Sequence, residues 1–381
     1  MTIFAGLLLL AAAPQAERAV DVEEQWVPFT LTPANQIRFA IRIDGRAATA
    51  ILDTGVTTST IARRFATAAG IASRSGAGAL TVSGRVASGW TAPHMLTIGA
   101  SARRVAHLAV ADLPATATGG DTIDLLIGTD VTAAYALDID YEAGRFRLLP
   151  SGRLPFRGST APLRVGADWA FYRTELTIAG MHIDRIVVDT GDGTALSLAR
   201  PTATSLSDLQ PAMTTTLDFA IGGTRVVDLA ILPEVRSGTL TLRNIETRIE
   251  PARGFAEATG MAGRIGSGLL RHYRVLLDPG AGRMVLAPGR HADRPPLRST
   301  SGFLLAVRPD RLAVLHVMRG SPAEQAGWKA GDAICAVDDA PVAPGYPSSG
   351  RAGWPVAAAG RTVMLTDCTG VNRPVTLRHF Y

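Results

Sequence analysis

The chain has 381 residues, of which 47% are hydrophobic, and it contains 39 Gly and 23 Pro. This length and apolar content exclude a disordered chain and allow two or three ordinary domains. The formal net charge is +5, but the basic residues are nearly all Arg and are scattered along the chain. Binding of nucleic acid needs a cluster of positive charge, so the composition predicts no nucleic-acid partner.

The chain begins with the apolar run MTIFAGLLLLAAAPQA, residues 1–16, which ends in small residues. This layout is typical of a secretory signal peptide that is cleaved near Ala13 to Ala16, although a positive first segment is missing. The apolar run is too short to cross a bilayer comfortably. We therefore expect an exported protein, periplasmic or extracellular, with an uncleaved anchor as the alternative.

The next feature is an internal repeat. The phrase AILDTGVTTST at 50–60 recurs as IVVDTGDGTALSL at 186–198, so that Asp189 follows Asp53 by 136 residues (189 − 53). Two later landmarks recur at an offset of 138 residues (266 − 128): LLIGTD at 125–130 matches GRIGSGLL at 263–270, and DIDYEAGRFRLLP at 138–150 matches LLDPGAGRMVLAP at 276–288. The sequence therefore predicts two related units, 25–150 and 163–290, joined by a linker at 151–162 that is rich in turn-forming residues.

Both units have the pattern of β structure. Short alternating runs such as IRFAIRI at 37–43 are separated by Gly, Asp and Pro, which is typical of strands joined by hairpins. The helical candidates are brief, for example TIARRFATAAG at 60–70, which ends in Gly70. A mainly β protein follows from this pattern.

Each unit resembles one lobe of a retropepsin-like aspartic protease of the bacterial type, because it has apolar-apolar-Asp-Thr-Gly, then a Gly-containing hairpin, then an apolar-apolar-Gly phrase. The resemblance implies a bilobal pepsin/retropepsin-like fold in tandem, in which Asp53 and Asp189 meet as a catalytic pair. It also implies supporting roles for Thr54, Gly55, Thr190 and Gly191, and a monomer with an internal pseudo-two-fold axis. Extended peptides or unfolded proteins would be the substrates.

The chemistry of such a pair needs neither a metal nor a cofactor. Two carboxylates within hydrogen-bonding distance share one proton, because both cannot ionise comfortably. One then accepts a proton from a water molecule while the other donates a proton to the peptide carbonyl. None of the seven His residues lies in a ligand-spaced pair, so the sequence predicts no metal site.

Two hairpins are candidates for flaps over the cleft: TVSGRVASGW at 81–90, with Gly84 and Gly89, and FAIGGTRVV at 219–227, with Gly222 and Gly223. Glycines at these positions permit tight turns and movement. The alternative is that both are ordinary surface hairpins.

The second motif departs from the first at Asp192, where the first has Val56. A third carboxylate that faced the cleft would raise the pKa of the other two. Two hypotheses therefore remain: an active endopeptidase, or an inactive protease fold that serves as a peptide-binding scaffold.

The last segment, 297–381, resembles a PDZ domain, a β-barrel that binds an extended peptide along a sheet edge. RGSPAEQAGWKAGDAICAVDDAPV at 319–342 carries the resemblance, which implies that Gly302, Phe303 and Leu304 begin the peptide-binding strand. APGYPSSGRAGWP at 343–355 stands where a second helix is expected. The only two cysteines, Cys335 and Cys368, form either a disulfide or two buried thiols.

Overall fold

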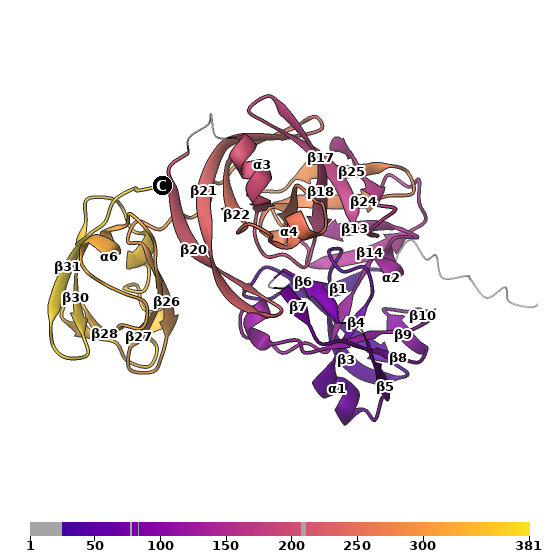
Figure 1. The fold of residues 1–381 in the computed structure, drawn as a ribbon, viewed down its shortest axis with the longest axis horizontal. Helices are drawn as coiled ribbons and strands as arrows, with labels where there is room; N and C mark the ends of the chain where they lie inside the picture. The colour runs from indigo at the N-terminus through magenta and orange to yellow at the C-terminus, as the bar shows by residue number, and fades with distance from the viewer. Residues whose placement is uncertain (1–24, 77, 83, 207–210) are drawn as a thin grey trace, which may run out of the picture.

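The structure is a computed structural model that describes residues 25–76, 78–82, 84–206 and 211–381 (Figure 1). The predicted signal peptide, 1–16, lies outside the described residues. The expectation of a mainly β protein is confirmed, since three large sheets and a small hairpin account for the strands. Among the described residues, no helix has the length and hydropathy that a membrane crossing requires.

The first unit is a sheet in which hydrophobic side chains alternate with exposed ones. In β2 (Ile37–Ile43) the four residues at alternate positions from Ile37 are buried and the intervening ones are not. The strand β12 (Leu125–Ile127) lies between β3 (Arg46–Leu52), to which it is parallel, and β4 (Thr60–Ala62). The remaining elements are β1 (Val27–Leu31), α1 (Arg63–Ala68), β5 (Ser73–Ser75), β6 (Ala79–Thr81), β7 (Gly84–Val86), β8 (Gly89–Thr91), β9 (His94–Ile98), β10 (Ser101–Val105), β11 (Ala109–Ala111), η2 (Ala115–Thr118) and α2 (Thr129–Thr132).

The second unit repeats this pattern of pairing. Here β23 (Gly263–Gly266) lies between β18 (Met181–Asp189), to which it is parallel, and β19 (Leu196–Leu198). The repeated sequence landmarks therefore mark equivalent strands. The remaining elements are β16 (Arg164–Val165), β17 (Tyr172–Ile178), α3 (Arg200–Ser205), β20 (Met213–Ala220), β21 (Gly223–Ser237), β22 (Leu240–Ile249), α4 (Phe255–Ala258) and α5 (Ser267–Leu270).

A shared sheet joins the two units. Its order is β15 (Ser159–Pro162), β25 (Arg283–Pro288), β24 (Tyr273–Asp278), β13 (Ala136–Asp140), β14 (Arg145–Leu149) and β1. The central strands β13 and β24 come from the same place in each repeat and pair antiparallel, with Asp138 opposite Leu276. One hydrophobic core runs through both units. The predicted linker, 151–162, includes β15, which belongs to this sheet.

The C-terminal segment has a core of its own, in which Phe303 packs edge-on against Trp328 and Trp354. Its sheet has β26 (Phe303–Val307) at one edge, followed by β27 (Leu312–Val317), β28 (Ala333–Val337), β30 (Thr362–Asp367) and β31 (Asn372–Thr376). The short elements are α6 (Pro322–Gln325), β29 (Ala340–Pro341), η4 (Tyr346–Ser348) and η5 (Trp354–Val356). The two 3₁₀ turns occupy the place where a second helix was expected.

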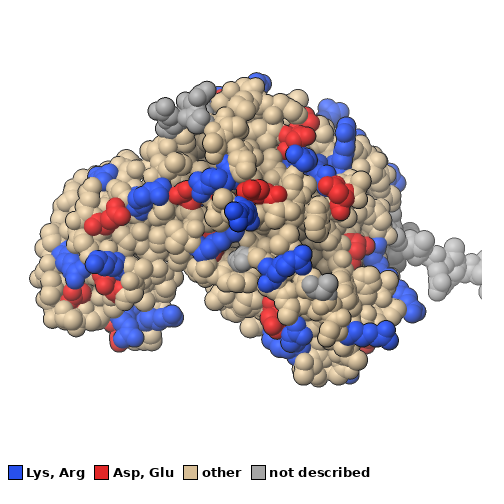
Figure 2. Space-filling view, in the orientation of Figure 1, with Lys and Arg blue, Asp and Glu red and all other residues tan. Residues whose placement is uncertain are grey.

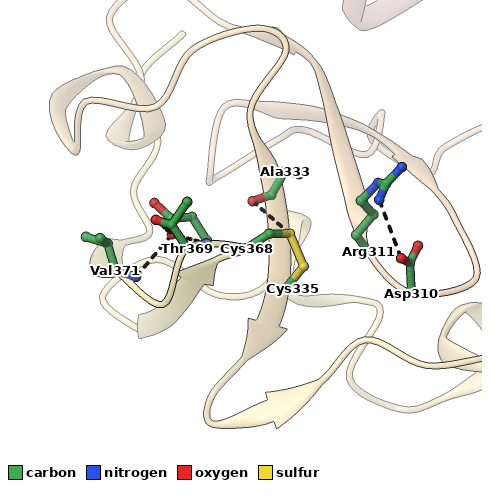
Figure 3. Close-up of a disulfide and its surroundings, with 8 residues drawn as sticks. Asp310, Arg311, Ala333, Cys335, Cys368, Thr369 and Val371 are labelled. Atoms are coloured by element: carbon green, nitrogen blue, oxygen red, sulfur yellow. Dashed lines mark hydrogen bonds and ion pairs between the residues drawn. A yellow bond between two sulfur atoms is a disulfide. The ribbon is translucent and has the colours of Figure 1, made fainter.

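Of the two alternatives for the cysteines, the structure has the disulfide. Cys335 of β28 is joined to Cys368, which follows β30, with a separation of 5.0 Å between the Cα atoms (Figure 3). The bond therefore links β28 to the residue that follows the adjacent strand β30.

The C-terminal segment docks on the outer strand of the second unit, as Figure 1 shows beside β20 and β21. The Thr214 hydroxyl donates to the backbone oxygen of Arg319 at 2.8 Å, and the Thr215 hydroxyl lies 2.9 Å from Nε2 of His316. Leu229, Met318 and Tyr381 form a small buried cluster between the two parts. Charged residues of both signs are interspersed over the face shown in Figure 2.

Candidate active site

The two Asp-Thr-Gly motifs lie where β3 and β18 end. Asp53 follows the last residue of β3, and its backbone N–H donates to Ile127 of the neighbouring β12 at 2.9 Å. Asp189 is the last residue of β18 and pairs with Gly266 of β23. Each chain then turns sharply, because the N–H of the residue three positions after each Asp donates back to the Asp carbonyl at 3.3 Å.

The two threonines tie the loops together. Thr54 donates its hydroxyl to the Val188 carbonyl at 2.6 Å and accepts the N–H of Thr190 at 3.0 Å. Thr190 makes the same pair of bonds in the other direction, to the Leu52 carbonyl at 2.7 Å and from the N–H of Thr54 at 3.1 Å. Both side chains are fully buried, so four hydrogen bonds shielded from water fix the two loops relative to each other.

The glycines let the carboxylates approach the opposite loop. A Cβ atom at Gly55 would overlap the carboxylate of Asp189, and one at Gly191 would overlap that of Asp53. Each glycine also donates its N–H to the Asp of its own motif, at 3.0 Å for Asp53 and 2.9 Å for Asp189. The structure therefore brings together all six residues that the motif marks.

The environment raises the pKa of both carboxyl groups. Burial is the largest cause for Asp53, followed by the charge of Asp189, and together they raise its pKa well above the ordinary value. Burial also raises the pKa of Asp189 to about 6, with a further contribution from Asp192. The two side chains are hydrogen-bonded to each other, and such a pair shares a proton.

Asp192 is held in an ion pair. Nε of Arg264 lies 3.1 Å from Oδ2 of Asp192 and 3.8 Å from Oδ2 of Asp189, and Nη1 of Arg264 donates to Glu250 at 2.8 Å. Burial alone would raise the pKa of Asp192, but Arg264 and the N–H of Thr194 lower it. Asp192 therefore remains ionised, and Arg264 offsets much of its charge at the dyad.

A cleft with a volume of about 630 Å³ opens over the two aspartates. Asp53 and Asp189 lie in its lining with 9% and 7% of their surfaces exposed, so water and a substrate can reach them. Leu304, Leu305 and Leu315 of the C-terminal segment line the same cleft. The C-terminal segment is thus part of the wall of the cleft.

The flap candidates lie on two hairpins that meet over the cleft. The Thr81 hydroxyl donates to the Ile221 carbonyl at 2.7 Å, and Nη1 of Arg225 donates to the Val82 carbonyl at 2.6 Å. Gly84 begins β7, Gly222 lies in the turn between β20 and β21, and Gly223 begins β21, all three with positive φ. Gly89 lies instead in β8, where a Cβ would press on the Arg74 carbonyl. That glycine serves strand packing beyond the hairpin.

The residues expected to begin a peptide-binding strand lie at the start of β26. Gly302 has a φ of +86°, Phe303 is buried in the core, and Leu304 faces the cleft over the two aspartates. The three N–H groups at this point are already bonded: that of Ser301 to the Pro355 carbonyl, that of Gly302 to the Ser299 hydroxyl and that of Phe303 to the Ser301 hydroxyl. They are therefore not free to receive the carboxylate of a peptide C-terminus.

A second groove runs beside β26. It has a volume of about 290 Å³ and is lined by β26 residues and by Tyr346 and Trp354, whose indole N–H donates to the Tyr346 hydroxyl. Phe303 lines this groove, whereas Leu305 lines both the groove and the cleft over the two aspartates.

Several polar residues of the site were not predicted. Gln36, in the turn between β1 and β2, donates to the Gly191 carbonyl at 2.8 Å and so supports the second motif from the first unit. The charged wall of the second unit consists of these residues together with Asp192: Asp218, Arg225, Arg248, Glu250 and Arg264. Arg264 could have been noticed, since it replaces Leu126 when the two repeats are aligned. In the described part of the chain, no group of three or more His, Cys, Asp and Glu side chains is arranged to hold a metal.

Comparison with known protein families supports an aspartic protease motif at the first Asp-Thr-Gly. Residues 39–131 match the family model of aspartyl proteases. The matched segment contains Asp53, Thr54 and Gly55, and it extends through β12 into α2. It therefore supports an aspartic protease domain in the first unit, whereas the second unit and the C-terminal segment lie outside the match. No curated protein sequence shows a significant match to the chain.

Proposed function

We propose that this protein is an aspartic endopeptidase in which Asp53 and Asp189 form one catalytic dyad within a single chain. The observation that carries the proposal is the mutual placement of the two carboxylates, each resting on the glycine of the opposite Asp-Thr-Gly loop. The aspartyl protease match over 39–131 supports the same reading for the first half of the dyad.

The proposed reaction needs one proton on the dyad. The ionised carboxylate removes a proton from a water molecule while the water oxygen bonds to the peptide carbonyl carbon, and the protonated carboxyl group donates its proton to the carbonyl oxygen. The resulting tetrahedral diol collapses as the C–N bond breaks. The protonated carboxyl group gives its proton to the departing amine nitrogen while one hydroxyl of the diol gives its proton to the ionised carboxylate, so the dyad again holds one proton.

The surroundings of the dyad suit an extended peptide. The cleft is open enough to admit one, and the two hairpins that carry Thr81 and Ile221 would enclose it.

We further propose that the C-terminal segment is PDZ-like and binds an internal stretch of a substrate or partner, because β26 is a free sheet edge whose first N–H groups are already bonded. Export to the periplasm or the cell exterior remains part of the proposal.

The test is digestion of a denatured protein mixture from about pH 3 to pH 8, with and without a statine-type transition-state inhibitor. Asp53→Asn should lower the rate at least about a hundredfold, because an amide cannot exchange the proton. Asn at this position can still accept the N–H of Gly55, so the variant should fold. Asp112→Asn is the matched control, because the Asp112 side chain is 78% exposed.

Each outcome discriminates between the two hypotheses. Inhibitable cleavage that Asp53→Asn abolishes and Asp112→Asn retains would support the endopeptidase. Peptide binding without cleavage at any pH would contradict it and favour the inactive scaffold. Equal cleavage by wild type and Asp53→Asn would contradict both.

A further inference from the structure

The two repeats have different types of side chain at equivalent positions beside the dyad. In the first unit, neighbouring strands align Leu126 of β12 with Thr60 of β4, and Thr60 with Ala109 of β11. The equivalent row of the second unit is Arg264 of β23, Ser197 of β19 and Arg248 of β22. Leu126 and Ala109 of the first unit therefore correspond to Arg264 and Arg248 of the second.

The residue after each motif shows the same difference. Val56 follows the first Asp-Thr-Gly and packs against the apolar cluster of Ile51, Leu113, Ile123 and Leu126. Asp192 follows the second and pairs with Arg264. The cleft is therefore apolar on one side of the dyad and charged on the other. Its lining includes Val56 and Leu126 on the first side and Asp192, Arg248 and Arg264 on the second.

Hydrogen-bond donors are in surplus on the charged wall. Both oxygens of Asp218 are used, Oδ1 by Arg248 and Oδ2 by Arg225, and both oxygens of Asp192 are used by Arg264 and the N–H of Thr194. Arg248 bonds only through Nη1, and its Nε is buried with no hydrogen-bond partner among the described residues.

Arg248 is also the arginine that a ligand can reach. Its side chain is 23% exposed, against 3% for Arg264. Both oxygens of Asp218 are already used, so the unused hydrogen-bonding capacity of Arg248 is for an acceptor of hydrogen bonds.

We propose that the second unit forms a subsite for a substrate side chain that ends in a hydrogen-bond acceptor, Gln or Glu, and that Arg248 determines this specificity. The first unit then binds an apolar side chain on the other side of the scissile bond. An apolar side chain beside Arg248 would exclude water without replacing its hydrogen bonds, which is the basis of discrimination at such sites. This inference rests on the proposed function.

The test uses extended peptides that differ only at the two residues flanking the scissile bond. One peptide has Leu on both sides, and the others have Gln, Glu or the similarly sized Met on one side or the other. Wild type should cleave the peptides with Gln or Glu in one of the two orders with a kcat/KM at least about tenfold above that for Met. Arg248→Met should lose this ratio while it still cleaves the Met peptide. The Glu to Gln ratio reports the contribution of charge.

Arg243→Met is the matched control, because Arg243 lies on the same strand and its side chain is 70% exposed. Peptide affinity of the Asp53→Asn variant, with and without Arg248→Met, separates binding from catalysis. A preference in affinity without any cleavage by wild type would support the subsite and contradict the endopeptidase. Equal affinities for the Gln, Glu and Met peptides would overturn the subsite, whether or not cleavage occurs, and so would an unchanged ratio in folded Arg248→Met protein.

Discussion

At the scale of single residues, the pKa of the dyad depends on which charges lie within a few ångströms. Asp192 raises the pKa of Asp189, and Arg264 lowers it from a distance of 3.8 Å. Burial is the larger cause, and the pKa of Asp53 is raised further than that of Asp189, so the shared proton stays on Asp53 when Asp189 ionises. If the shared proton is needed for catalysis, activity should extend well above the strongly acidic range and decline only as the pH rises past the raised pKa of Asp53.

Substitution of Asp192 tests this electrostatic balance. Asp192→Asn removes the negative charge that raises the pKa of both Asp53 and Asp189, and it leaves Arg264 freer to lower the pKa of Asp189. Both effects have the same sign, so the alkaline limb of the kcat/KM profile should move to lower pH by on the order of half a unit to one unit. The measurement is kcat/KM against pH. Asp184→Asn, whose side chain is 71% exposed, should leave the limb in place, and an unmoved limb in Asp192→Asn would contradict the argument.

The sequence predicts the place of a residue in the site when a local motif marks that residue, and not when only strand pairing brings its partner close. Asp53 and Asp189 could be expected to meet because their motif recurs with its downstream landmarks, and the structure does bring them together. The partner of Asp192 could not be predicted, because Arg264 reaches it only through the pairing of β23 with β18 and β19. Asp192 therefore looked like an uncompensated third carboxylate. The catalytic roles themselves stay predictions.

At the scale of elements, two hairpins that are far apart in the sequence are linked over the cleft. The sequence predicted both hairpins from their glycines, but no pattern could show that their tips contact each other, since the contact joins β6 to the turn after β20. The helix predicted at 60–70 is likewise shortened to α1, because Thr60–Ala62 pairs with β11 and β12 as β4. Tertiary pairing overrides the local pattern in both cases.

Thr81→Val should loosen the link between the hairpins. It removes the bond to the Ile221 carbonyl and the bond of the same hydroxyl to the Gly84 carbonyl within the first hairpin, and Val keeps the shape of the side chain. A lost hydrogen bond of about 1 kcal/mol corresponds to about a fivefold change in the closed population. Amide hydrogen exchange should therefore become faster in both hairpins, and KM for peptides should rise by a similar factor. Thr204→Val, at an exposed hydroxyl on α3, is the control. Faster exchange in only the first hairpin would contradict the link.

At the scale of the whole molecule, the C-terminal segment is attached to the strand that leads to one flap. It holds β20 through Thr214 and Thr215, and the same strand ends at the turn that contacts Thr81. The segment also adds Leu304, Leu305 and Leu315 to the cleft. A bulge between Leu304 and Leu305 interrupts the alternation of β26, which explains how two consecutive leucines line one cavity.

Weakening this attachment should therefore affect long substrates more than short ones. Met318→Ala removes most of a side chain that is 5% exposed in the small cluster with Leu229 and Tyr381, at a cost of about 2 kcal/mol to docking. A dodecapeptide that reaches the leucines of β26 and β27 should lose several-fold in kcat/KM, because the wall it contacts is no longer held in place. A hexapeptide confined to the dyad region should lose much less. Val371→Ala, at a side chain that is 51% exposed on the far part of the segment, should change neither value. An equal loss for both peptides in Met318→Ala would mean that the C-terminal segment acts through the stability of β20 and the flap, and not as a wall of the cleft.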